Sequence, residues 1–164
     1  MPTNTPGPLV IQLAFDGFES ANASGGYGWL GPWQSIRPFV IGGEDPHAGD
    51  WQLDLLSGVL SANLVYRMAN LAAYDDVHLR FWSRLSRVTI GSQATIYVRP
   101  GIDRDWREAK RFSMVESDGI YHLYDIDLSG FGMSDGSTLG FYAVMDPATD
   151  GWRIDDVELV GVAR

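Results

Sequence analysis

The sequence predicts an all-β fold, an antiparallel β-sandwich with about nine or ten strands in two sheets. Apolar and polar residues alternate over short segments along nearly the whole chain, as they do in strands that bury one face. Clusters of Gly, Pro, Asn and Asp separate these segments, as turns do, for example at 42–50 and 99–105. Because no crossover helices can be placed between the strands, two antiparallel sheets are the simplest arrangement.

Length and composition predict one globular unit. The chain has 164 residues, of which 45% are hydrophobic, and this is enough for a substantial core. The opening "MPTNTPGP" has the composition of a stiff linker between modules. We therefore expect residues 1–8 to be a linker remnant and residues 9–164 to form a single β-sandwich module.

Charge and cysteine content exclude several classes of protein. The net charge of −9 disfavours binding to nucleic acid and to anionic membrane surfaces, since both need clusters of basic residues. No apolar run has the length of a membrane span, so we expect no membrane insertion. The chain has no cysteine, which excludes disulfides and thiolate metal sites.

The clearest alternation marks five strands. A weaker pattern marks two more, and Pro38 in the first of these indicates an edge strand or a bulge. One segment, 63–76, has Leu64, Met68 and Leu71 at helical spacing, but a strand followed by a loop or short helix fits its neighbours better. The clear strands are 8–15, 51–56, 77–85, 93–99 and 138–145, and the weaker ones are 36–41 and 121–128.

The last strand, within 150–161, changes face partway along. Trp152 and Ile154 fall on one side of the two-residue period, and Val157 and Leu159 fall on the other. The change occurs at the adjacent acids Asp155 and Asp156, which predicts a β-bulge that redirects their carboxylates.

Several segments, in their order along the chain, resemble the jelly-roll modules of secreted proteins. The resemblance is carried mainly by "FES" at 18–20, "LRFWSR" at 79–84 and "WRIDDVEL" at 152–159, and it spans 9–161. Two related groups share this pattern: the calcium-containing carbohydrate-binding modules and the MAM-like domains. The resemblance implies a jelly roll whose first and last strands are neighbours, in a secreted, extracellular multimodular protein with neighbouring domains.

The resemblance also implies a structural calcium ion beside the end strands. It places Glu19 and Asp156 as ligands, with backbone carbonyls around 47–50, and Asp16 as a possible further ligand. The residue types are compatible with this, because calcium takes six to eight oxygen ligands. The alternative is that the acids are solvated, or that Asp155 pairs with an arginine.

Signals for catalysis are weak. The three histidines show no metal-binding spacing, and neither an HExxH motif nor a nucleophile elbow is present. A pair of carboxylates for glycoside hydrolysis is left open, since two acids need only meet in space. We expect a non-catalytic protein.

Signals for sugar binding are stronger. His78, Arg80 and Trp82 lie on one face of their strand, and Tyr97 and Arg99 lie on the non-core face of the next. If these strands are neighbours, the aromatic rings can stack on a pyranose while the polar groups bond its hydroxyls. Alternatively, Trp82 packs under a loop.

Two loop aromatics, Trp29 and Trp106, form a second candidate site. They can equally serve as anchors that hold their loops in place. The net charge of −9 disfavours acidic glycans unless Arg80, Arg84 and Arg99 form a local positive strip.

These observations predict a carbohydrate-binding module that holds a structural calcium and binds a polysaccharide or oligosaccharide. The main alternative is a MAM-like domain for protein interaction, adhesion or extracellular assembly. A passive spacer is the third possibility.

Overall fold

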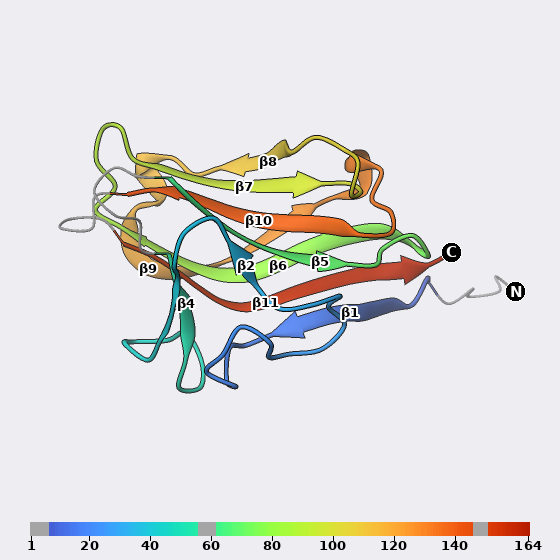
Figure 1. Ribbon diagram of the computed structural model, residues 1–164, viewed down its shortest axis with the longest axis horizontal. Coiled ribbons are helices and arrows are strands. Elements are labelled where there is room, and N and C mark those ends of the chain that lie inside the picture. Colours follow the sequence, from blue (N-terminus) through green and yellow to red (C-terminus); the bar gives the residue numbers. More distant parts are fainter. Residues whose placement is uncertain (1–6, 56–61, 146–150) are drawn as a thin grey trace, which may run out of the picture.

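The computed structural model describes residues 7–55, 62–145 and 151–164, which form two antiparallel sheets packed face to face (Figure 1). Most of the predicted linker, residues 1–6, lies outside the described residues. Sheet A has the order β3 (Val40–Gly42), β4 (Gln52–Asp54), β11 (Gly151–Ala163), β6 (Tyr74–Ser86) and β9 (Asp118–Asp127), and β1 (Val10–Asp16) also pairs with β11. Sheet B has the order β2 (Gln34–Ser35), β5 (Asn63–Ala69), β10 (Ser137–Val144), β7 (Gln93–Arg99) and β8 (Arg107–Arg111). The all-β sandwich is confirmed.

The described residues contain eleven strands, against a prediction of nine or ten. The two strands without a sequence signal are β2, which has only two residues, and β8, whose sequence REAKR has no apolar alternation. The 63–76 segment begins as β5 and has no helix. The only helices in the described ranges are two short 3-10 turns, Met114–Glu116 and Ser129–Phe131, and no helix there is long and apolar enough to cross a membrane.

The terminal strands are neighbours, as predicted. β1 runs antiparallel to β11, from the pair Val10–Val162 to the pair Asp16–Val157. The predicted bulge is also present: the register between β11 and β6 shifts after Asp155, and Asp156 has a φ of +47°. Because the bulge reverses the alternation, Ile154 and Val157 are both fully buried in the core.

Aromatic side chains from both sheets meet in the core. The ring of Phe141, on β10, lies 5.3 Å from that of Phe81 and 6.0 Å from that of Trp152. The indole N–H of Trp152 donates to the Ser83 hydroxyl at 2.8 Å, so burial leaves no unpaired donor. Trp51, which alternates with core residues, is partly buried against this core.

The condition for a shared sheet-face site, that β6 and β7 are neighbours, is not met. β6 pairs with β11 and β9 in sheet A, whereas β7 pairs with β10 and β8 in sheet B. The connection at 87–92 therefore crosses from one sheet to the other (Figure 1). Alternation shows which residues of one strand share a face, but it does not show which sheet the strand joins. Trp82 and Tyr97 consequently lie on opposite outer faces of the sandwich.

A buried ion pair connects the two sheets. The Arg67 guanidinium, from β5, lies 2.5 Å from the Asp16 carboxylate at the end of β1, and the two side chains are 3% and 1% exposed. The Asp16 carboxylate also accepts bonds from the indole N–H of Trp33 at 2.9 Å and the backbone N–H of Phe18 at 2.8 Å. Arg67 in turn donates to the Gly31 carbonyl at 2.7 Å. The pair thus fixes the loop after β1 as well as the sheets.

We predict that Asp16→Ala lowers the free energy of unfolding by about 3–5 kcal/mol, because the change leaves the Arg67 charge buried without its partner. Urea unfolding monitored by tryptophan fluorescence measures this. Arg164→Ala is the control: it removes an exposed pair with Asp75 and should cost about 1 kcal/mol or less. Equal losses in the two variants would contradict the role of the buried pair.

Candidate functional site

The bulge in β11 presents two carboxylates to the segment at 47–51. Asp155 is fully buried, and its carboxylate accepts the backbone N–H groups of Ala48 at 3.1 Å and of Asp156 at 2.8 Å. The Asp156 carboxylate lies 3.2 Å from Nδ1 of His47. His47, Asp155 and Asp156 have ligand atoms within 4.8 Å of one another, and they are the only such group of three or more in the described ranges.

Glu19 lies outside this group of three but contacts the same segment. Its carboxylate accepts the backbone N–H of Asp50 at 3.0 Å and that of Trp51 at 3.2 Å. Gly49 permits this approach, since a Cβ there would lie 2.2 Å from the Glu19 carboxylate, and its φ is +62°. Glu19 therefore holds the segment from one side, while Asp155 and Asp156 hold it from the other.

These residues fit a calcium ion in part. Asp155 and Asp156 offer the carboxylate oxygens that calcium prefers, whereas the imidazole of His47 is a ligand better suited to transition metals. Asp16 is already bonded to Arg67, Trp33 and Phe18, so we leave it out of the ion site. Burial, together with the nearby charge of Asp156, raises the pKa of Asp155 to about 6, although backbone N–H bonds oppose this. A bound cation would compensate both charges.

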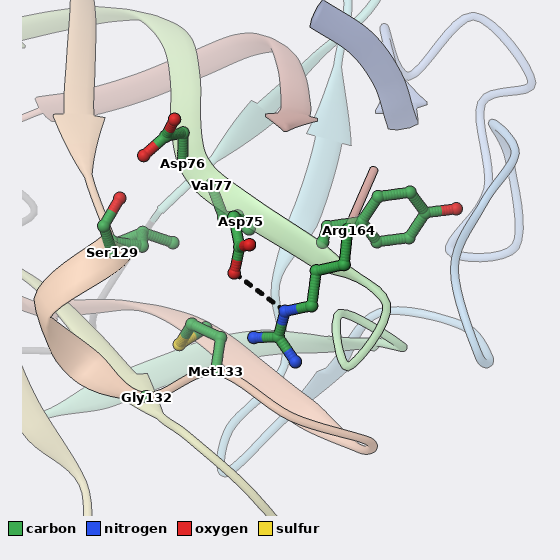
Figure 2. A pocket seen from close by; sticks show the side chains of 9 residues that line it. Asp75, Asp76, Val77, Ser129, Gly132, Met133 and Arg164 are labelled. Atoms are coloured by element: carbon green, nitrogen blue, oxygen red, sulfur yellow. Dashed lines mark hydrogen bonds and ion pairs between the residues drawn. The ribbon is translucent and has the colours of Figure 1, made fainter. Parts of the chain in front are cut away.

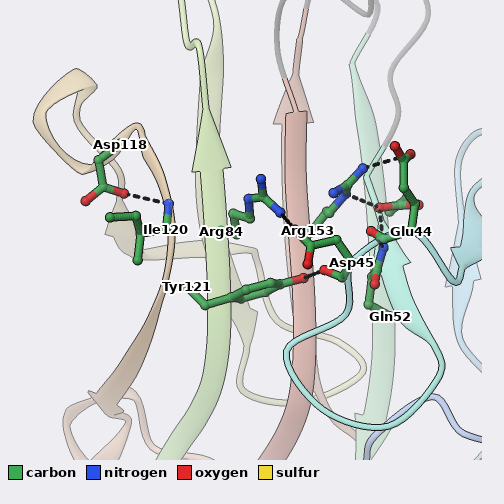
Figure 3. A network of polar contacts seen from close by, with 9 residues as sticks. Glu44, Asp45, Gln52, Arg84, Asp118, Ile120, Tyr121 and Arg153 are labelled. Carbon is green, nitrogen blue, oxygen red and sulfur yellow. Dashed lines mark hydrogen bonds and ion pairs between the residues drawn. The ribbon is translucent and has the colours of Figure 1, made fainter.

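Trp82 lies on the outer face of sheet A, under the segment at 43–51. The His47 ring stacks on the Trp82 indole at a centroid distance of 3.8 Å and an interplanar angle of 13°. Ion pairs fasten the segment in place: Arg84 with Asp45, and Arg153 with Glu44 (Figure 3). One face of the indole is thus covered by the protein itself.

Further polar side chains on this face pair with one another. His78 and Arg80 both contact Asp125, at 2.5 and 2.8 Å. Tyr121 donates to the Asp45 carbonyl at 3.2 Å (Figure 3). The predicted candidates His78, Arg80 and Trp82 are therefore close together on sheet A, but their partners are protein groups.

The outer face of sheet B carries a different set of residues. Gly140, at the centre of β10, pairs with Tyr66 of β5 on one side and with Tyr97 of β7 on the other. The Trp106 indole lies directly over Gly140. A Cβ added at this glycine would be only 3.2 Å from the indole ring. Trp106 contacts Tyr66 edge-on at 6.0 Å. We call the residues Tyr66, Tyr97, Arg99, Trp106 and Tyr142 the aromatic face.

Tyr142 and Arg99 complete the aromatic face. Tyr142 lies two residues along β10 from Gly140, and its ring meets that of Tyr97 edge-on at 5.7 Å. The Arg99 guanidinium lies 5.2 Å from the centre of the Trp106 ring. Since all five side chains are only partly buried, the rings can meet a ligand from solvent.

The structure thus brings together three of the predicted binding residues, Tyr97, Arg99 and Trp106. Tyr66 was missed because its segment was ambiguous between strand and helix, although it alternates with the core residue Val65. Trp29 is elsewhere: it packs against Trp33 at 5.7 Å and donates to a β1 carbonyl, so it anchors the loop after β1.

One further cavity, of about 370 Å³, lies where β6 begins and β11 ends (Figure 2). Arg164 and Asp75 form an ion pair at 2.7 Å in its wall, and Asp76, Ser129 and Met133 also line it. None of the residues that the sequence predicts for a site lines this cavity.

Comparison with known proteins shows the fold alone. No protein family matches the sequence, and no curated protein is similar to it in sequence. The chain is similar in structure to the first family 22 xylan-binding domain of Xyn10C from Paenibacillus barcinonensis, with a TM-score of 0.59, 15% identity, and coverage of 97% of this chain and 99% of that one. Other solved carbohydrate-binding modules, of families 22 and 61, match as well.

Proteins with other roles share the same architecture. The K3 adhesin domain of Lys-gingipain from Porphyromonas gingivalis has a TM-score of 0.62 at 12% identity, with 92% of this chain and 98% of that one covered. The enzymatically active domain of a tailspike protein from bacteriophage CBA120 has a TM-score of 0.59 at 11% identity, with 88% of this chain and 20% of that one covered. The jelly-roll β-sandwich is therefore established, and this fold by itself does not specify a function.

We predict that Asp155 makes stability depend on pH when chelator is present. The folded state holds the Asp155 proton up to about pH 6, and the unfolded chain releases it near 3.8, so the stability it contributes is full below 3.8 and is lost as pH rises through about 6. Each unit of pKa difference corresponds to about 1.4 kcal/mol. Asp155→Asn should remove this dependence in urea unfolding from pH 4 to 7.5. Parallel pH profiles for the variant and the parent protein would contradict it.

Proposed function

We propose that this protein is a non-catalytic carbohydrate-binding module whose ligand lies on the aromatic face. The row Tyr66–Gly140–Tyr97, with the Trp106 indole over its centre, is the observation that carries the proposal. Aromatic rings of this kind stack on the apolar faces of sugar rings, while tyrosine hydroxyls and the Arg99 guanidinium bond to sugar hydroxyls. The ligand is a polysaccharide or an oligosaccharide.

The similarity in fold supports this proposal, because one similar structure is described as a xylan-binding domain and another as a complex with β-1,4-galactotriose. We further propose that the module is extracellular and works beside other domains. The similar gingipain adhesin domain favours an adhesion or protein-interaction role as the second candidate.

Substitutions on the two outer faces test the proposal. We predict that Tyr97→Ala and Trp106→Ala each weaken binding at least tenfold, since each removes a stacking ring and its buried contact area. Trp82→Ala, on the opposite sheet, should leave the affinity unchanged. The measurement is affinity electrophoresis in a panel of neutral and acidic polysaccharides, followed by calorimetry with oligosaccharides of the best ligand.

Two results would contradict the assignment. Binding that survives Tyr97→Ala and Trp106→Ala but is lost in Trp82→Ala would move the site to sheet A. Absence of binding across the panel, together with self-association on sizing, would favour the adhesion role.

We also propose that a structural calcium ion binds at the bulge in β11. Asp155 and Asp156 would supply carboxylates, backbone carbonyls of 47–50 would complete the shell, and Glu19 would brace the segment. The fully buried Asp155, which has no cationic side chain as a partner in the part of the chain that the structure describes, supports a cation there. The ion would supply only charge compensation and cross-linking.

Calcium should raise the melting temperature of this protein. At about a hundredfold excess over its dissociation constant, an ion that binds only the folded state adds about 2.7 kcal/mol. Asp156→Asn should abolish the response, and Glu19→Gln should weaken or abolish it. Asp125→Asn is the control, because that carboxylate pairs with His78 and Arg80 away from the bulge.

Thermal unfolding with calcium, zinc or chelator measures these effects. A response to zinc alone that His47→Asn removes would contradict calcium and identify a nitrogen-ligated site. A melt that neither metal changes would overturn the ion site.

A further inference from the structure

We propose that the glycan on the aromatic face is acidic, and that Arg99 and Arg104 recognise carboxylates of its uronic acid units. This inference rests on the proposed function. It follows from where the protein leaves its cationic side chains without carboxylate partners.

Most basic residues of this acidic chain are neutralised locally. Seven of its twelve lysines and arginines form ion pairs with carboxylates within the described ranges. Arg80 and Arg84 are among the seven, so the positive strip that they would form with Arg99 does not exist. Three of the five without such a pair cluster at 99–107, where β7 turns into β8.

Arg99 is held in place without being neutralised. One of its terminal nitrogens donates to the Thr138 hydroxyl at 3.2 Å, and its guanidinium lies over the Trp106 ring. Its Nε is buried and has no hydrogen-bond partner. A partly desolvated cation in this state gains from an anion that approaches its exposed side.

Arg104 and Arg107 line an open cavity of about 420 Å³ at the end of β7. Pro100, which follows Arg99, lines it as well, and Trp106 directly precedes Arg107 in the chain. Arg107 pairs with the core residue Val98, so its side chain leaves β8 on the face opposite Trp106 and Tyr97. There it donates to the Phe131 carbonyl and lies 5.2 Å from the centre of the Phe131 ring, outside the proposed contact. The cavity has the volume of a small-ligand site, and planar guanidinium groups match the geometry of carboxylates.

One acid, Asp105, lines the same cavity, yet no ion pair joins it to Arg104 or Arg107 among the contacts of the described residues. Its charge opposes an anionic ligand. Asp105→Asn and the arginine substitutions should therefore change the affinity for an acidic glycan in opposite directions, which a merely structural role would not produce.

The experiment compares acidic polymers with their neutral counterparts. Glucuronoxylan, polygalacturonate and alginate are each tested before and after chemical reduction of their carboxylates to alcohols, by affinity electrophoresis and calorimetry. We expect at least one acidic polymer to bind about tenfold or more tightly than its reduced form, as charged hydrogen bonds imply, and added salt should reduce the difference.

Substitutions test which residues cause the preference for an acidic polymer over its reduced form. Arg104→Gln should remove most of the preference for the acidic polymer without changing affinity for the reduced polymer. Arg99→Gln should weaken binding to the acidic polymer more than binding to its reduced form, and Asp105→Asn should increase the preference. Arg80→Gln is the control on sheet A and should change neither. Arg104 lies in the loop before β8, so its variant keeps the test valid if Arg99→Gln unfolds.

Each remaining outcome is decisive. Equal affinity for acidic and reduced polymers would overturn this inference and leave sugar binding intact. Preference for a sulfated xylan without any preference for uronates would overturn the carboxylate assignment. Absence of binding to these polymers and to neutral xylan, galactan and glucan would overturn the proposed function as well.

Discussion

The buried ion pair between Asp16 and Arg67 is the contact on which the arrangement of this sandwich depends. It joins the end of β1 in sheet A to β5 in sheet B, and it bonds the loop after β1 through Gly31 and Trp33. Removing two charges from water is expensive, and the further hydrogen bonds to Gly31, Trp33 and Phe18 offset part of that cost here. Its neighbour Tyr66 points the other way, onto the aromatic face, so the same strand connects the core to the candidate site.

The two outer faces differ in how their polar groups are satisfied. On sheet A, acids and bases pair with one another, and the segment at 43–51 covers Trp82 with His47. On sheet B, aromatic rings surround a glycine, and Arg99 has no acidic partner in the described part of the chain. A face whose polar groups already pair with one another gains little from a ligand. Exposed rings and an unneutralised cation, in contrast, gain contact area and charge compensation when a ligand binds.

The bulge in β11 shows how a local irregularity can serve two purposes. It restores the burial of Val157 after two adjacent acids, and it turns the carboxylates of Asp155 and Asp156 toward 47–51. The cost is a buried carboxylate whose pKa is raised to about 6. A cation at this position would offset that cost while fastening the covering segment.

Alternation along the chain determined the class of fold, most strands and the bulge at Asp155, because alternation and its interruption are local properties. The pairing of the end strands came from the resemblance to jelly-roll modules. Only the tertiary structure decided which residues meet. Whether β6 and β7 share a sheet depends on the path of the 87–92 connection, and the partner of Asp16 lies 51 residues away on another sheet. Part of the candidate site was therefore predicted: Tyr97, Arg99 and Trp106 meet on one face, whereas Trp82 lies on the opposite face. The sequence could not show this division, because strand pairing is set by packing across the whole core.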